Sequence, residues 1–124
     1  MTLPLLIAFA GAMGAGGILL AAAGAHAAPN AGLQAAAYML LFHAAAILGG
    51  AALTQQGMLW RPVMLIVLVA WAGGAMLFSG DVAVRAFSGH RLFPMAAPAG
   101  GILLTAAWIA LIGVAICAVI RRAS

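Results

Sequence analysis

The sequence has very little charge. Lysine and glutamate are absent, Asp81 is the only acidic residue, and 5% of the 124 residues are charged against 68% that are hydrophobic. Because a soluble domain carries about 25% charged residues, a chain of this composition has too few polar groups to cover a surface in water. The composition excludes a soluble globular domain and predicts a surface that faces lipid.

The residue sets of several kinds of functional site are also missing. The five arginines form no basic run with interleaved aromatic residues, so we expect no nucleic-acid binding. Cys117 is the only cysteine, which excludes an internal disulfide and leaves no metal-ligand spacing; we expect it to be a packing residue. No carboxylate pair, nucleophile–base arrangement or phosphate-binding loop occurs. We therefore expect no catalytic residues, no metal and no cofactor in a protein that is not an enzyme.

What the chain has instead is four long apolar runs separated by short segments that contain Gly, Pro or Asn. Each run supplies the roughly 20 residues that a helix needs to span a bilayer. The predicted spans are residues 3–27, 33–53, 63–85 and 98–120. Short connections make neighbouring helices antiparallel. The sequence thus predicts one all-α domain over residues 1–124, an integral membrane four-helix bundle with up-down-up-down topology.

The first run ends in "GAHAAPN", in which the alanines around His26 have the form of a signal-peptidase site. A signal peptide has a basic segment before an apolar core of about 7–15 residues. No Lys or Arg precedes Arg61, and the first run is long enough to span. We therefore predict an uncleaved span followed by a tight turn, with His26 near the last helical carbonyls, which its side chain stabilises.

The arginines are distributed unevenly between the two ends of the predicted bundle. With four spans, both termini and the second loop share one side, which holds Arg61, Arg121 and Arg122. The other side holds Arg85 and Arg91 together with the one acidic residue. Positive residues accumulate on the cytoplasmic side, so the pattern favours cytoplasmic termini. The Ala-rich, Arg-only composition is typical of a GC-rich bacterium, which indicates the inner (plasma) membrane.

Glycine and alanine recur at spacings that place them on single helix faces. In lipid, helices associate through close backbone contact, which small residues permit. We expect these residues to pack the helices of the bundle together, and the alternative is that part of the stripe binds another protein. The glycines that we expect to matter for packing are Gly14, Gly17, Gly24, Gly100 and Gly101.

Four motifs together resemble one family: "GAHAA", "FHAAAILG", "LFSG", and "PAGG" followed by Trp108. Their order and spacing are similar to those of small four-span membrane proteins of the domain-of-unknown-function 423 family, which includes transmembrane protein 256-like proteins. The resemblance covers roughly residues 11–117 and implies a four-helix integral membrane protein without implying a reaction. The positions that match its motifs are Gly24, Ala25, His26, His43, Phe78, Ser79, Gly80, Pro98, Gly100 and Gly101.

The chain departs from the family pattern at three places. The segment 81–83 is Asp-Val-Ala where the family usually has Ser-Leu-Tyr. Ala97 replaces a threonine before the proline of the last span, so a hydroxyl that could cap this helix is missing. Tyr38 lies five residues before His43 rather than four, which puts the two on different helix faces. A polar site shared by the family would be altered here.

Two polar features lie inside the predicted spans. Asp81 and Arg85 are four residues apart, the spacing of an ion pair on one helix face; binding of a partner's charge and ion or proton handling are the alternatives. His43 lies about 15 Å into the second span at 1.5 Å per residue. We expect a neutral histidine that bonds to a neighbouring helix, with Ser79 and carbonyls beside glycines as candidate partners. His26 lies at another depth, so the two histidines are a poor pair for haem.

One end of the bundle collects the remaining polar residues. The ends of the first and third spans and the start of the second meet there, which makes it the place where a polar site could form. The alternative is a set of scattered interfacial residues whose side chains extend to the headgroups. The residues of this end are His26, Tyr38, Asp81, Arg85 and His90.

These observations predict a non-enzymatic membrane protein, an accessory or structural subunit that binds lipids and partner membrane proteins or associates with itself. The small-residue faces, the short loops and the absence of a soluble domain motivate this prediction. One alternative is a small homo-oligomeric channel, transporter or proton-handling protein that uses His43 and Asp81. A second is quinone or haem binding near Trp71, Trp108 and His43.

Overall fold

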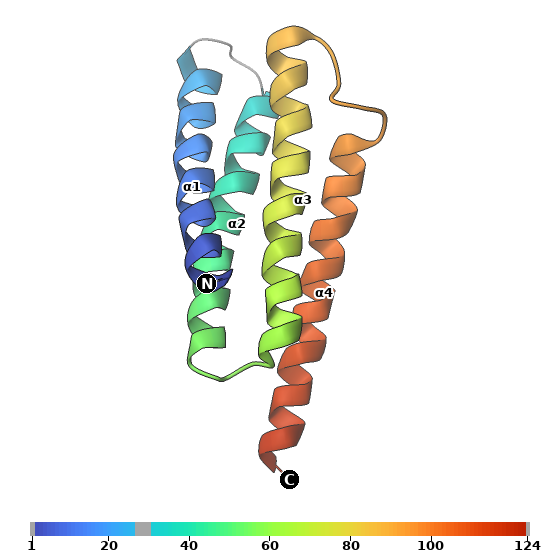
Figure 1. The fold of residues 1–124 in the computed structure, drawn as a ribbon. Coiled ribbons are helices and arrows are strands. Elements are labelled where there is room, and N and C mark those ends of the chain that lie inside the picture. The colour runs from blue at the N-terminus through green and yellow to red at the C-terminus, as the bar shows by residue number, and fades with distance from the viewer. Residues whose placement is uncertain (1, 27–30, 124) are drawn as a thin grey trace.

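The computed structural model describes residues 2–26 and 31–123 and consists of four long helices (Figure 1). All four are long and apolar enough to cross a membrane, and the described residues contain no strand. Consecutive helices run antiparallel, so the predicted all-α bundle with up-down-up-down topology is confirmed. The helices are α1 (Thr2–His26), α2 (Ala31–Gln55), α3 (Arg61–Ser88) and α4 (Ala96–Ala123).

The helices extend beyond most of the predicted spans. Each of the last three begins two residues earlier and ends two or three residues later than its apolar run. The added residues include polar ones such as Gln55, Arg61 and Arg121, which a prediction based on apolar runs leaves out. The predicted end of the first span at residue 27 and the turn that follows it lie outside the described residues.

The four helices pack in chain order and leave the bundle open along one side. α1 packs on α2, α2 on α3 and α3 on α4, with a smaller contact between α1 and α3. Among the described residues, no Cα of α4 lies within 8 Å of a Cα of α1 or α2. Figure 1 shows α1 and α4 at opposite edges. As a result, 17% of the most apolar stretch of α4 is buried, against 44% in α2 and in α3.

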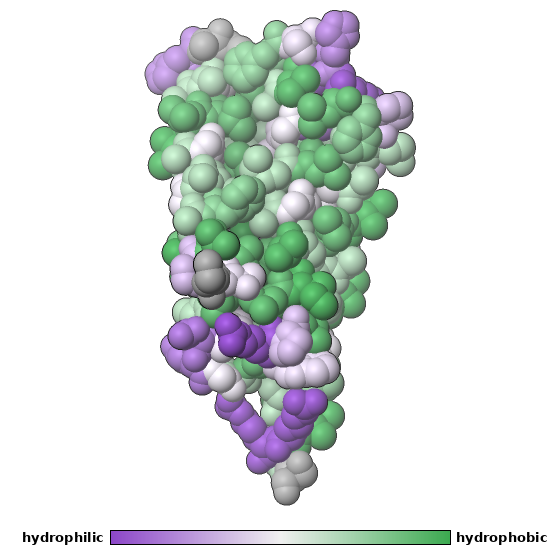
Figure 2. All heavy atoms as spheres, viewed as in Figure 1, coloured by the Kyte–Doolittle hydropathy of each residue, from purple (hydrophilic) through white to green (hydrophobic). Residues whose placement is uncertain are grey.

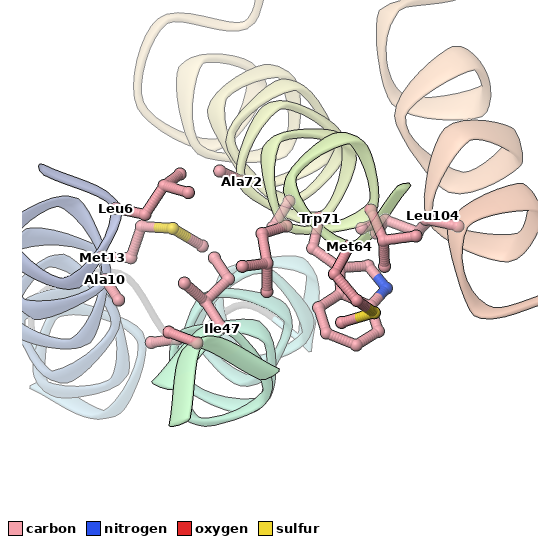
Figure 3. Packing of buried hydrophobic residues seen from close by; sticks show 14 of the residues in the cluster. Leu6, Ala10, Met13, Ile47, Met64, Trp71, Ala72 and Leu104 are labelled. Carbon is pink, nitrogen blue, oxygen red and sulfur yellow. The ribbon is translucent and has the colours of Figure 1, made fainter. Parts of the chain in front are cut away.

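The buried core lies along α2 and α3 and receives side chains from both outer helices (Figure 3). Trp71 of α3 is its largest fully buried side chain. Met13 enters from α1, Ile47 from α2 and Leu104 from α4. Lipid tails are as apolar as this core, so burial alone does not drive helix association; close packing and dispersion contacts hold the helices together.

Glycine determines how closely two of the helix pairs approach. A Cβ on Gly17 would lie 2.7 Å from Leu41 Cγ, where α1 crosses α2. A Cβ on Gly100 would lie 2.7 Å from both the carbonyl oxygen of Gly74 and the backbone nitrogen of Phe78, where α4 crosses α3. Since backbone atoms cannot move aside as a side-chain end can, the α3–α4 crossing in particular requires glycine at position 100.

The other glycines of the predicted packing set occupy different surroundings. A Cβ on Gly14 or on Gly101 would meet no atom within 4 Å of those considered in the described part of the chain. Gly24 is half-buried in the last turn of α1. Some glycines of the pattern thus lie at tight helix crossings and others at open positions. The spacing of the glycines in the sequence does not show which is which.

The start of α4 differs from the expectation based on Ala97. The helix begins at Ala96, and Met95 precedes it with a φ of 69°. The backbone N–H of Ala99 donates to the carbonyl of Met95 at 2.9 Å. Position 97 is therefore inside the first turn, so the interpretation of Ala97 as a lost N-cap residue is wrong. A hydroxyl at that position would lie after the cap rather than at it.

Candidate functional site

Asp81 connects two segments at one end of the bundle. Its side chain on α3 is 1% exposed, and Oδ2 accepts a hydrogen bond from Arg85 Nη2 at 3.1 Å. Oδ1 accepts from the backbone N–H of Leu92, in the link between α3 and α4, at 2.9 Å. The Arg85 side chain is 44% exposed and extends outward. The buried carboxylate thus has a partner for each oxygen and attaches the link to the end of α3.

The spacing of Asp81 and Arg85 indicated this ion pair, whereas nothing in the sequence indicated Leu92. A backbone N–H carries no residue-specific signal, so its partner becomes visible only when the path of the link is known. The C-terminus of α3 shows why the link turns back here. Gly89 adopts a left-handed φ of 75°, and its N–H donates to the carbonyl of Arg85 at 3.0 Å, a common helix ending.

Ser79 forms an interhelical hydrogen bond, but its partner is not the predicted His43. Its buried hydroxyl donates to the carbonyl of Ala36 at 2.9 Å and so joins α3 to α2. The expectation that Ser79 bonds to His43 is wrong, because the serine lies closer to the start of α2 than the histidine does. In lipid, where helices lack a hydrophobic drive to associate, such a bond helps to hold the pair together.

His43 bonds within its own helix and to α4. Nδ1 lies 2.9 Å from the carbonyl oxygen of Met39, and Nε2 lies 3.3 Å from Nε1 of Trp108. The indole nitrogen only donates, so Nε2 accepts and the proton sits on Nδ1, which donates to Met39. This is the neutral imidazole, and both of its nitrogens are satisfied. The side chain is 7% exposed.

Two tryptophans extend this contact into the core. The ring centroids of Trp71 and Trp108 are 4.4 Å apart with planes tilted by 44°. Nε1 of Trp71 is buried and has no hydrogen-bond partner in the described part of the chain. We call His43, Trp71 and Trp108 the aromatic cluster; its members come from α2, α3 and α4, respectively.

The aromatic cluster borders an open groove between α2 and α4. The groove has a volume of about 710 Å³ and is predominantly apolar. Met39 and His43 line it from α2, and Gly101, Thr105 and Trp108 are among the residues that line it from α4. It exists because no Cα of α4 lies within 8 Å of a Cα of α2 in the described ranges. We call this feature the α2–α4 groove.

The predicted polar end is only partly assembled. His26 is exposed at the end of α1, and His90 is exposed in the link after α3. Tyr38 is 47% exposed, and its hydroxyl accepts a bond from Gln34 Nε2 at 3.2 Å. In the described ranges, none of these three takes part in the contacts of Asp81. Of the five residues predicted for this end, only Asp81 and Arg85 are brought together.

No metal centre is evident in residues 2–26 and 31–123, where no three His, Cys, Asp or Glu side chains group closely enough to hold an ion. His26 and His43 lie on different helices, and the contacts of His43 are with Met39 and Trp108. Neither ring nitrogen of His43 is therefore available to a metal without breaking a hydrogen bond.

The opposite end contains a basic arrangement, whose arginines were used above only to predict the orientation. Arg121 Cζ lies 5.2 Å from the centroid of the Trp60 ring, and Arg122 Nη2 lies 3.5 Å from the carbonyl oxygen of Met58. The last turn of α4 thus packs against the α2–α3 link. Figure 2 shows hydrophilic residues at both ends of the molecule with an apolar band between them, as expected for a membrane-spanning protein.

Comparison with known proteins agrees with the resemblance seen in the motifs. The family model described as "Protein of unknown function (DUF423)" matches residues 20–101, about two thirds of the chain. The chain belongs to this family. No curated protein and no solved structure matches the chain. The matched range includes His43, Ser79 and Asp81 and ends before Trp108 and the terminal arginines, so it is narrower than the range suggested by the motifs.

Proposed function

We propose that this DUF423 protein is a non-enzymatic accessory subunit of a membrane complex, which binds other membrane proteins or lipids through its fourth helix. The observation that supports this proposal is the open bundle: among the described helices, the backbone of α4 packs closely only on α3, and a side-chain hydrogen bond between Trp108 and His43 joins it to α2. Large apolar side chains on α4, such as Ile102, Ile109 and Ile116, are more than half exposed. In the membrane this surface contacts either lipid or another protein.

The α2–α4 groove has the features of a helix-docking surface. Gly101 and Thr105 line it and lie four residues apart, which places them on one face of α4. A Cβ on Gly101 would meet no atom within 4 Å of those considered in the described residues. Small residues at this spacing allow a second helix to approach the backbone closely. A partner helix can therefore approach α4 more closely at the groove than at the part of its surface that carries exposed isoleucines.

Purification from the native membrane in a mild detergent followed by mass spectrometry tests this proposal. We expect a specific membrane protein to co-purify with the wild-type chain and to be lost in Gly101→Leu, which fills the groove. Gly113→Leu is the matched control, because Gly113 is an equally open position on α4 that does not line the groove. A chain that always purifies alone, or a partner that both variants retain, would contradict the proposal.

We also propose a bacterial inner-membrane location with both termini in the cytoplasm. The end with the α3–α4 link carries Arg85 and Arg91. The other end carries Arg61, Arg121 and Arg122. Positive residues accumulate on the cytoplasmic side, so three arginines against two support this orientation.

A second candidate function is the binding of a quinone-like lipophilic ring at the aromatic cluster. Trp108 is 44% exposed and lines the α2–α4 groove, where a flat ring can stack on its indole. Trp71 is buried behind Trp108 and does not line the groove, so the exposed indole face of Trp108 alone carries this candidate.

Bound quinone in the purified protein, detected by extraction and absorbance, is the test of this second function. Added short-chain quinone should quench tryptophan fluorescence, and Trp108→Leu should weaken the quenching. A colourless, quinone-free preparation whose fluorescence does not respond would count against it. A transport function has less support, because His43 and Asp81 are held in separate contacts on different helices.

A further inference from the structure

The end of the molecule opposite Asp81 concentrates positive charge. Arg61 begins α3, and Arg121 and Arg122 are in the last turn of α4. Asp81, the only Asp or Glu in the chain, lies 20 residues along α3 from Arg61, which is about 30 Å at 1.5 Å per residue. Asp81 is therefore too far away to form an ion pair with the arginines of this end.

These arginines surround a cleft rather than a flat surface. The cleft has a volume of about 320 Å³ and lies between the α2–α3 link and the last turns of α4. Trp60 and the three arginines line it together with apolar residues such as Val114 and Ala118. Because Arg121 stacks on Trp60 and Arg122 bonds to a backbone carbonyl, both guanidinium groups are held beside the opening. We call this feature the basic cleft.

An apolar groove adjoins the basic cleft. It has a volume of about 170 Å³ and shares Met58, Leu59, Ala118 and Arg122 with the cleft. Leu53, Ala115 and Val119 complete its lining. The basic cleft and the apolar groove are thus adjacent and share part of their lining.

We infer that the basic cleft and its apolar groove form a binding site for an anionic membrane phospholipid. Guanidinium groups bind phosphate through paired, charge-assisted hydrogen bonds. Tryptophan and arginine at the ends of spanning helices lie at headgroup level, which is the depth of a lipid phosphate. The apolar groove beside the cleft accepts the first part of an acyl chain. Free phosphate would use only the basic cleft, whereas a phospholipid uses both the basic cleft and the apolar groove. We therefore assign the site to a lipid.

The inference deepens the lipid-binding part of the proposed function, on which it rests, and uses residues outside the α2–α4 groove. The α2–α4 groove lies along the first half of α4, whereas the basic cleft involves its last turns. Partner binding through Gly101 and lipid binding through Arg121 and Arg122 can therefore be lost separately, which allows the failure of one proposal to be distinguished from the failure of the other.

Native mass spectrometry of the full chain, delipidated and titrated with lipid, tests the site. We expect phosphatidylglycerol to bind at least about tenfold more tightly than phosphatidylcholine with the same acyl chains, because anionic lipid adds attraction at each arginine. Arg122→Gln should reduce this preference and the double change Arg121→Gln with Arg122→Gln should abolish it. Arg91→Gln, an equal loss of charge at the other end, should leave it unchanged.

A second variant separates a shaped site from general charge attraction. Ala118 is half-buried and lines both hollows, so Ala118→Leu fills their common wall while every arginine remains. We expect this variant to lose lipid, and millimolar inorganic phosphate to leave wild-type lipid binding unchanged. The inference is overturned if the two lipids bind equally or if Arg91→Gln and Arg122→Gln have equal effects. It is also overturned if Ala118→Leu binds lipid fully or if phosphate displaces the lipid. If the double variant does not fold, the single variants decide.

Discussion

Asp81 shows how one residue can hold a membrane helix and the following link in place. Its buried carboxylate accepts from Arg85, one turn further along α3, and from the backbone of Leu92. An isolated charge at this depth would be costly, but the arginine and the N–H together replace its hydration.

Replacing Asp81 should therefore loosen the start of the link. Asp81→Ala leaves the N–H of Leu92 without its acceptor, which should lower the free energy of unfolding by about 1–3 kcal/mol. Asp81→Asn should cost less, because its amide oxygen still accepts from that N–H. Unfolding in detergent followed by far-UV circular dichroism measures both values. Equal stability of the alanine variant and the wild type would show that the link does not depend on Asp81.

At the scale of helices, α3 and α4 associate through a backbone crossing. Gly100 and Gly74 face each other so closely that a Cβ on either would meet the carbonyl oxygen of the other at 2.7 Å and 3.0 Å, respectively. This crossing matters because α4 has no comparable contact with α1 or α2 among the described residues. The close approach of the fourth helix to α3 thus depends on this small-residue contact.

Gly100→Ala and the neighbouring Gly101→Ala form a matched pair. The first inserts a methyl group against backbone atoms and should cost about 1–3 kcal/mol, as overpacking does. The second adds a methyl group in open space and replaces a poor helix former by a good one, so it should leave stability equal or raise it by up to about 1 kcal/mol. Detergent unfolding of the two proteins gives the comparison. Similar values for both would mean that α4 shifts to accommodate the methyl group.

The sequence predicts the helices and the ion pair, but not the contacts between helices. The length and apolarity of each run identify a span, and an i,i+4 spacing places Asp81 beside Arg85. The contacts between His43 and Trp108 and between Ser79 and Ala36 depend on which helices are neighbours and how each is rotated. Because all four helices are apolar on most faces, the periodicity of their sequences does not predict which helices are neighbours or how each is rotated.

The prediction for the polar end fails in part for the same reason. His26 and His90 share an end of the molecule with Asp81, yet a common depth does not produce a contact when one residue is exposed on an outer helix and the other is exposed in a link. The packing at the basic end was missed because two distant pairs, Trp60–Arg61 and Arg121–Arg122, come together only through the length of α4.

At the scale of the whole molecule, the uneven distribution of arginines defines an orientation that labelling can measure. In a Cys117→Ser background, single cysteines at Gln56 and His90 mark the two ends, and both positions are exposed. We expect an impermeant maleimide added to intact spheroplasts to label His90→Cys at once and Gln56→Cys only after permeabilisation. The reverse pattern would place both termini outside, and equal labelling would mean that both orientations are inserted.

The chain-order packing of the helices also bears on how the protein is made. α1 and α2 meet as soon as the second span has entered the bilayer, α3 then adds to α2, and α4 adds to α3. No helix needs to wait for a segment synthesised much later, and contacts between nearby parts of a chain form fastest. The order of helices across the molecule is therefore also an order of assembly during translation, in which the last helix to enter the membrane is the one with most of its surface still open.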